Sequence, residues 1–209
     1  LTGTVEQDAG TEVSGDIVKK DTPEGTLEVH FLDVGHGDST LVICGAHAMM
    51  IDCGDSAQGM MLQEYLSDHH VTKLDYLILT HPDKDHIGGA SAVLTKFSVG
   101  QVFQSVFQKG SETEERLQQT LKLKNTDAVT PEPGAEYQLG DAWFTILAPN
   151  GIYEESNDSS IALLLHFGEN TFLFTGDAEK EAEEDMVENS ENPGRSLKAD
   201  VYQAGHHGD

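Results

Sequence analysis

Basic residues, cysteines and long apolar segments are all scarce in this chain of 209 residues. Lysine and arginine number 12 against 37 aspartates and glutamates, which gives a formal net charge of -25. Such a charge repels polyanions, so we expect no strong non-specific binding to nucleic acid or anionic membranes. No apolar run reaches the roughly 18 residues of a membrane helix, so we expect no transmembrane segment.

Only two cysteines are present, Cys44 and Cys53, and they flank a predicted hairpin. A simple register with the turn at residues 45–47 does not place them opposite each other. We therefore expect two free, partly buried thiols rather than a disulfide. Cysteine usage leaves the cellular compartment open.

Large apolar residues are nearly absent from residues 1–26, which are polar and acidic. This composition predicts a flexible acidic leader, followed by one folded domain over residues 27–209. A leader of this kind often follows a removed signal peptide or lipid anchor. We therefore expect an extracellular or cell-surface location, with a cytoplasmic one as the alternative.

Apolar periodicity predicts alternating strands and helices in the folded part. The run "LDYLILT" is almost continuously apolar, which is typical of a strand buried on both faces. The pattern favours a layered α/β protein with sheets covered by helices. Strands are predicted over 27–33, 39–44, 47–52, 74–80, 99–106, 142–148, 160–167, 171–176 and 199–204, helices over 57–68, 88–97, 111–124 and 178–189, and a turn-rich connection over 130–141.

Four metal-ligand side chains follow the strand at 74–80 within six residues: His81, Asp83, Asp85 and His86. The carboxyl ends of strands are where α/β proteins place their sites. Imidazole and carboxylate groups are ligands for divalent metals. Two glycines come next and permit a sharp turn or a close backbone approach. The alternative, a solvated polar loop with capping aspartates, accounts less well for four such residues together.

This segment resembles the His-x-His-x-Asp-His signature of the metallo-β-lactamase fold. "MMIDCGD" resembles the family's first motif, with Asp52 at a strand end, and "FLFTGD" the motif whose aspartate, here Asp177, bridges two metals. "FLDVGHGDS", "NDSSIALLL" and "ADVYQAGHHGD" resemble the nuclease-like domain of DNA-uptake competence proteins and their soluble relatives. The resemblance covers residues 27–209 and implies an αββα sandwich and a metal-dependent hydrolase.

The sequence departs from the family pattern at three places. Asp83 replaces the signature's second histidine, which gives a more oxygen-rich site. Zinc is the metal expected first, and manganese or iron are alternatives for such a site. The usual third-motif histidine is replaced by the segment containing Asn157 and Ser160. The family fold normally continues past the position of His206 and His207, so the resemblance implies a C-terminus that is incomplete.

The resemblance implies two divalent metal ions. We expect His81 and Asp83 to hold the first and Asp85 and His86 the second, with Asp177 spanning both. A water between two such cations loses a proton near neutral pH and attacks an electrophilic phosphorus or carbonyl. Asp85 is also a candidate to orient or deprotonate that water.

Further polar residues are candidates around this centre. His206 or His207 is expected either to bind metal or to donate to the developing oxyanion. Asp33, His36 and Asp38 either support the metal ligands by hydrogen bonds or form a tight turn with an Asx cap. Supporting roles are also expected for Asp52, Asn157 and Ser160, and Lys84 is the basic residue expected nearest an anionic substrate.

The predicted function is a binuclear phosphodiesterase or nuclease that acts on a small or polymeric phosphodiester. One alternative is a phosphodiesterase on a non-nucleic substrate, such as a choline-phosphate ester of a surface polymer, which suits the acidic charge. Another is a metal-binding module without turnover. β-Lactamase or thioester hydrolysis is less favoured, because those branches resemble a full three-histidine first site.

Overall fold

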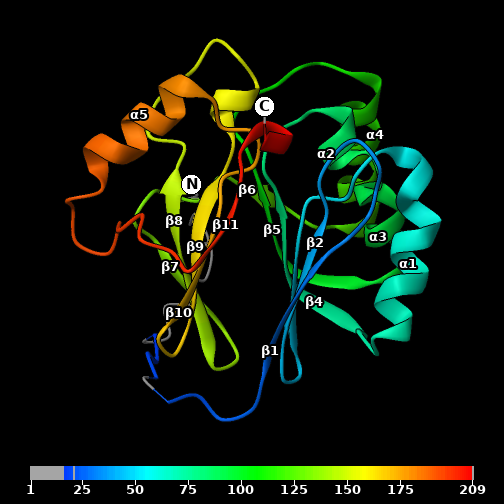
Figure 1. The fold of residues 1–209 in the computed structure, drawn as a ribbon. Helices are drawn as coiled ribbons and strands as arrows, with labels where there is room; N and C mark the ends of the chain where they lie inside the picture. The colour runs from blue at the N-terminus through cyan, green and yellow to red at the C-terminus, as the bar shows by residue number, and fades with distance from the viewer. Residues whose placement is uncertain (1–16, 21, 209) are drawn as a thin grey trace, which may run out of the picture.

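The structure is a computed structural model that describes residues 17–20 and 22–208. Two sheets pack face to face, and helices cover both outer faces (Figure 1). This four-layer αββα arrangement confirms the predicted fold class. The first sheet has the order β1 (Leu27–Phe31), β2 (Thr40–Cys44), β3 (His47–Ile51), β4 (Lys73–Leu79), β5 (Ser98–Gln104) and β6 (Ala128–Val129). The second has the order β11 (Val201–Gln203), β10 (Asn170–Phe174), β9 (Ala162–Phe167), β8 (Ala142–Ala148) and β7 (Glu136–Leu139).

Three apolar layers hold these elements together. The outer face of the first sheet packs against α1 (Gly59–Asp68), α3 (Ala90–Lys96) and α4 (Glu112–Lys124). The two sheets bury a middle layer between them, and α5 (Lys180–Asn189) covers the second sheet. In β4, Leu77 and Leu79 belong to the outer layer while Ile78 belongs to the middle one. The strand is therefore buried on both faces, as its apolar run predicts.

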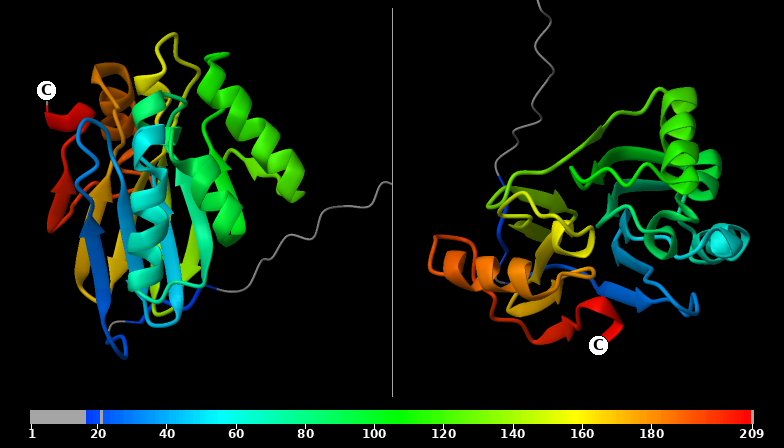
Figure 2. Two further views of the ribbon diagram at one scale, coloured as in Figure 1. Left: turned by 90° about the vertical axis from the view of Figure 1, so that its right-hand side faces the viewer. Right: turned by 90° about the horizontal axis from the view of Figure 1, so that it is seen from above.

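The strand directions bring many loops to one end of the sandwich. β3, β4 and β5 are parallel neighbours, so their carboxyl ends lie along one edge of the first sheet. β10 and β11 are parallel in the second sheet and end on the same side of the molecule. Viewed from that end, the C-terminal turn lies beside the loop between β1 and β2 (Figure 2). Segments far apart in sequence meet there.

The structure differs from the predicted elements mainly in two places. The expected turn-rich connection at 130–141 contains β7, a short edge strand whose residues are mostly half-buried. The motif residues 84–87 form a helical turn of their own, α2 (Lys84–Ile87), separated from α3 by the glycine pair. At α4, the Ser111 hydroxyl caps the helix by accepting from Glu114 N, while the Glu114 carboxylate accepts from Lys109 N and Gly110 N.

Most of the predicted leader, residues 1–16, lies outside the described residues, and its flexibility stays a prediction. Its described end contacts the hairpin of β7 and β8, where Lys19 pairs with Glu136 and Lys20 with Asp141. Cys44 and Cys53 are free, which confirms the expectation from the hairpin register, and both are buried rather than partly buried. Among the residues that the structure describes, no helix has the length and apolar character needed to span a membrane.

Candidate metal centre

A buried trio of ligand side chains lies at this end of the sandwich: His81, His86 and Asp177. His81 and His86 follow β4 in the first sheet, whereas Asp177 follows β10 in the second. Asp177 Oδ2 lies 3.2 Å from His86 Nε2 and 3.7 Å from His81 Nε2. His81 Nε2, His86 Nε2 and Asp177 Oδ1 have no hydrogen-bond partner within the described part of the chain. Leaving such buried polar atoms unpaired is costly, and a shared cation would satisfy all three.

Asp52 fixes the orientation of His86. It follows β3 with a left-handed backbone (φ 56) and is buried. Its carboxylate accepts from Thr80 N at 2.8 Å, from Thr80 Oγ1 at 2.6 Å and from His86 Nδ1 at 2.8 Å. Because His86 donates through Nδ1, its Nε2 is directed into the trio as a metal ligand would be.

The buried charges shift the two histidine pKa values in opposite directions. Burial, reinforced by His86, lowers the pKa of His81 to about 4, so its imidazole is neutral near pH 7. Burial alone would also lower the pKa of His86, but the carboxylates of Asp52 and Asp177 outweigh it and raise that pKa to about 11. His86 therefore carries the proton that a bound cation would displace.

Ser160, expected to have a supporting role, connects the second sheet to this trio. Its Oγ lies 3.3 Å from His81 Nδ1 and accepts from Asp177 N at 3.2 Å. One hydroxyl thus contacts two of the three ligand residues. Thr80 Oγ1 approaches the same His81 nitrogen, 3.1 Å from Nδ1.

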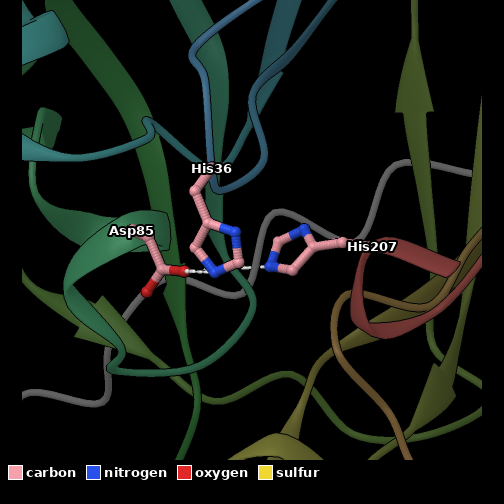
Figure 3. A group of neighbouring side chains, drawn as sticks. All are labelled: His36, Asp85 and His207. Atoms are coloured by element: carbon pink, nitrogen blue, oxygen red, sulfur yellow. Dashed lines mark ion pairs between the residues drawn. The ribbon is translucent and has the colours of Figure 1, made fainter. Parts of the chain in front are cut away.

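A second, more open group adjoins the trio and consists of His36, Asp85 and His207. The three side chains converge from the β1–β2 loop, from α2 and from the C-terminal turn (Figure 3). Asp85 Oδ2 lies 3.4 Å from His36 Nε2 and 3.7 Å from His207 Nε2. His207 Nε2 is also 3.5 Å from Asp177 Oδ2, so Asp177 contacts both groups.

Asp38 completes the surroundings of His207, with its Oδ1 3.5 Å from His207 Nδ1. Its Oδ2 accepts from Gln203 Nε2 at 2.8 Å. Burial and the nearby Asp52 charge raise the pKa of Asp38 above its ordinary value. The β1–β2 loop therefore contributes to the site through two of its predicted residues, His36 and Asp38.

Two glycines permit the close packing of these loops. A Cβ at Gly37, whose φ is 113, would lie 2.2 Å from the backbone oxygen of Asp85. A Cβ at Gly88 would lie 2.4 Å from both Ser56 N and Lys84 O. The glycines thus allow the motif loop to contact the loops that follow β1 and β3.

Asp83, predicted as a ligand of the first metal, faces away from the trio. Its Oδ1 accepts from Ser156 Oγ at 2.8 Å, and its Oδ2 accepts from Lys109 Nζ at 2.6 Å. Burial opposes ionisation of Asp83, but Lys109 and Ser156 together lower its pKa. Both oxygens of this carboxylate are therefore engaged outside the cluster.

Three other predicted residues also lie apart from the cluster. His206 Nδ1 contacts Glu179 Oε1 at 2.9 Å, so His207 rather than His206 is the member of the pair that turns inward. Asn157 donates to the same Glu179 oxygen at 2.9 Å. Asp33 is exposed and accepts from Gly35 N, which is the Asx-cap alternative.

Sequence reasoning missed two residues that contact the motif segment, one inside the site and one beside it. Thr80 bridges Asp52 and His81, and its position directly before the first motif histidine was the available signal. Lys109 is the lysine that pairs with a motif residue, whereas Lys84, the basic residue predicted nearest the substrate, is exposed. Lys109 lies 26 positions from Asp83, and no local pattern connects the two.

A sequence model of the metallo-beta-lactamase superfamily matches residues 32–209. The chain belongs to this superfamily. Its members are usually metal-dependent hydrolases. The unpaired donor atoms of His81, His86 and Asp177 agree with a metal-binding role, because neutral imidazole and carboxylate are ligands for divalent cations.

Competence proteins are among the relatives of this superfamily member. ComE operon protein 3 of Bacillus subtilis is 32% identical over 205 residues, which cover 87% of this chain and 25% of that protein. Recombination protein 2 of Haemophilus influenzae is 30% identical over 209 residues, covering 90% of this chain and 22% of that protein. The chain thus spans about a quarter of the length of these relatives.

Solved structures agree on the fold. A metallo-beta-lactamase with a HARLDQ motif from Cronobacter sakazakii superposes with a TM-score of 0.62 at 11% identity. The match covers 85% of this chain and 74% of that one. At this level of identity the likeness shows the shared fold alone.

Proposed function

We propose that this superfamily member is a binuclear metal-dependent phosphodiesterase. The observation that carries the proposal is the pair of adjoining ligand groups that share Asp177. His81 and His86 would hold one cation together with Asp177. His207, with Asp38 or with Asp85 and His36, would hold the second. Zinc is the first expectation for such ligands, with manganese and iron as alternatives.

The protein's own residues would position and polarise the reactants. Divalent cations bound here would supply a nucleophile near neutral pH and stabilise charge on the leaving oxygen. Asp52, Thr80 and Ser160 hold the ligand rings in place. Asp85, which is half-buried between two histidines, is placed to accept a proton at Oδ2.

A phosphodiester substrate is favoured by the named relatives, which are competence and recombination proteins. The net charge of -25 favours a small phosphodiester over bulk nucleic acid. A choline-phosphate ester is the alternative substrate, since its cationic group suits the acidic surface. The extracellular or cell-surface location likewise remains a proposal, supported by the acidic leader and tested by fractionating cells that express the full protein.

Metal analysis combined with a hydrolysis assay tests the proposal. Elemental analysis should find about two metals per chain in the wild type and in Asp75→Ala, whose carboxylate is paired with Lys73 and His47 outside the site. The variant Asp85→Ala/Asp177→Ala should lose metal and the hydrolysis of bis(p-nitrophenyl) phosphate together. Parallel assays with a dinucleotide and with p-nitrophenyl phosphorylcholine separate the two substrate classes. Bound metal without turnover of any ester would instead support a non-catalytic module.

A further inference from the structure

A groove of about 880 Å³ lies between α4, the carboxyl end of β5 and β6. It adjoins the strand that leads to the metal centre, because its lining residue Gln104 pairs with Leu79, two positions before His81. Its size is within the range of small-molecule sites. The proposed chemistry assigns it no role. Its walls are formed by residues 104–110, by one face of α4 and by residues 125–130.

The lining of this groove is rich in carboxamides and poor in cations. Each carboxamide presents two donor hydrogens and an acceptor oxygen, so the lining can pair with mixed donor and acceptor edges. Lys122 is the one basic residue in the lining, against the carboxylates of Glu114, Glu115 and Asp127, which disfavours a phosphate inside the groove. The carboxamides belong to Gln104, Gln108, Gln118, Gln119 and Asn125.

Apolar side chains accompany the carboxamides. Val106 and Val129 line the groove and are 58% and 44% exposed. Gln118 Nε2 donates to Gln104 Oε1 at 3.0 Å, which joins the helix wall to the strand wall through one hydrogen bond. The groove therefore combines apolar contact surface with hydrogen-bonding edges, as an uncharged polar ring requires.

The segment 105–110 separates the groove from the metal centre and is fixed on both sides. Ser105 Oγ donates to Ser159 O at 2.8 Å, next to Ser160 in the metal centre. Lys109 Nζ donates to Asp83 at 2.6 Å, and Gly110 N donates to Glu114 at 2.7 Å. One face of this segment thus contacts the motif loop, while Ser105, Gln108 and Gly110 line the groove.

We propose that this amide-lined groove binds the uncharged, hydrogen-bonding ring of the substrate, a nucleobase or a sugar, while the adjoining phosphodiester lies at the metal centre. The placement of the phosphodiester rests on the proposed function. Carboxamides recognise base edges through paired donor and acceptor contacts, and they serve sugar hydroxyls in the same way. The groove would then select among phosphodiesters that the metal centre treats alike.

Binding of phosphate-free probes tests this inference without metal or turnover. Metal-free protein is titrated with adenosine, uridine and N-acetylglucosamine and followed by backbone amide NMR. We expect one of the nucleosides or the sugar to bind, with amide chemical-shift changes confined to α4 and residues 104–110 and 125–130. The probe that binds identifies the ring as a nucleobase or a sugar. Absence of binding by all three at millimolar concentration, or shifts elsewhere, overturns it.

Substitutions add a second measurement. Gln104→Leu/Gln118→Leu should weaken binding of the probe by about thirtyfold, since two lost hydrogen bonds are each worth on the order of 1 kcal/mol. The matched control is Gln101→Leu, on the same strand but outside the groove lining. Unchanged affinity in a folded double variant overturns the assignment. These probes lack a phosphodiester, so their binding does not depend on hydrolysis. A protein that binds a probe but hydrolyses no ester would refute the proposed function and still support ring binding in the groove.

Discussion

Replacing Asp52 by asparagine should weaken metal binding although Asp52 is not itself a predicted ligand. Asparagine suits the left-handed backbone at this position, where φ is 56. Its amide nitrogen would face His86 Nδ1, which now donates to the carboxylate at 2.8 Å. The imidazole would then accept a hydrogen bond at Nδ1 and carry its proton on Nε2. Because Nε2 is the nitrogen that would coordinate the metal, this proton would have to leave before the metal binds.

The size of the effect follows from these contacts. Loss of a partner that orients a metal-bound histidine typically costs 10–100-fold in metal affinity, so we expect a loss of roughly that size. The metal-free protein loses a charged hydrogen bond between two buried groups, which should lower the free energy of unfolding by about 2 kcal/mol. The pKa of His86, raised to about 11 in the native state, adds a pH signature. Its stabilisation is complete below the ordinary value of 6.5 and is lost as the pH rises toward 11.

Competition against a chromogenic zinc chelator measures the affinity, and urea unfolding of metal-free protein measures the stability. Asp75→Asn is the matched control, because it removes a carboxylate at the opposite end of β4 from the site. Wild-type zinc affinity in a folded Asp52→Asn protein would refute the tautomer argument. An unaltered fall in stability between neutral and alkaline pH would refute the assigned charge on His86.

Three further perturbations test the packing. Gly37→Ala would place a Cβ 2.2 Å from a backbone oxygen, whereas the Cβ of Gly35→Ala would meet nothing within 4 Å. Thermal unfolding should show the Gly37→Ala protein to be less stable than the Gly35→Ala protein by roughly 1–3 kcal/mol. Equal stabilities of the two variants would contradict the close approach. Phe144→Ala opens the layer between the sheets and should cost about 3–5 kcal/mol in urea unfolding, so a loss under about 1 kcal/mol would count against that packing. Trp143, the only tryptophan, stacks on His166 at 3.8 Å. Burial lowers the pKa of His166 to about 4 from 6.5, so tryptophan emission should titrate near pH 4 and stability should be lost as the pH falls from 6.5 to 4. A midpoint near 6.5 would refute the effect of burial on this pKa, and emission that does not change with pH would count against the stack.

The sequence pattern predicted most elements because their apolar periodicity matched their burial. Leu62 and Leu66 of α1 face the core as their spacing indicates, and β4 is buried on both faces. β7 was missed because a four-residue, half-buried edge strand between turn residues carries little periodic signal. The break between α2 and α3 depends on contacts of the glycine pair with residues 53–56, which are remote in sequence.

The candidate site was predictable in its residue types and less so in their directions. His206 and His207 both adopt a left-handed backbone, and only the tertiary packing decides which ring turns inward. Asp83 has the residue type of a metal ligand, but Lys109 and Ser156 engage its oxygens from segments with no local relation to it. Motif spacing reports what chemistry is available, whereas long-range partners decide which group performs it.

Asp177 and His207 come from one sheet, whereas His81, His86 and Asp85 come from the other. A cation shared by these residues would act as a cross-link whose bond lengths set the separation of the two sheets at this end. Unfolding of the metal-bound protein would then be more cooperative than that of the metal-free protein, because neither sheet could separate without losing ligands. Substitutions that thicken or thin the apolar layer around Phe144 and Phe174 would change metal affinity from a distance.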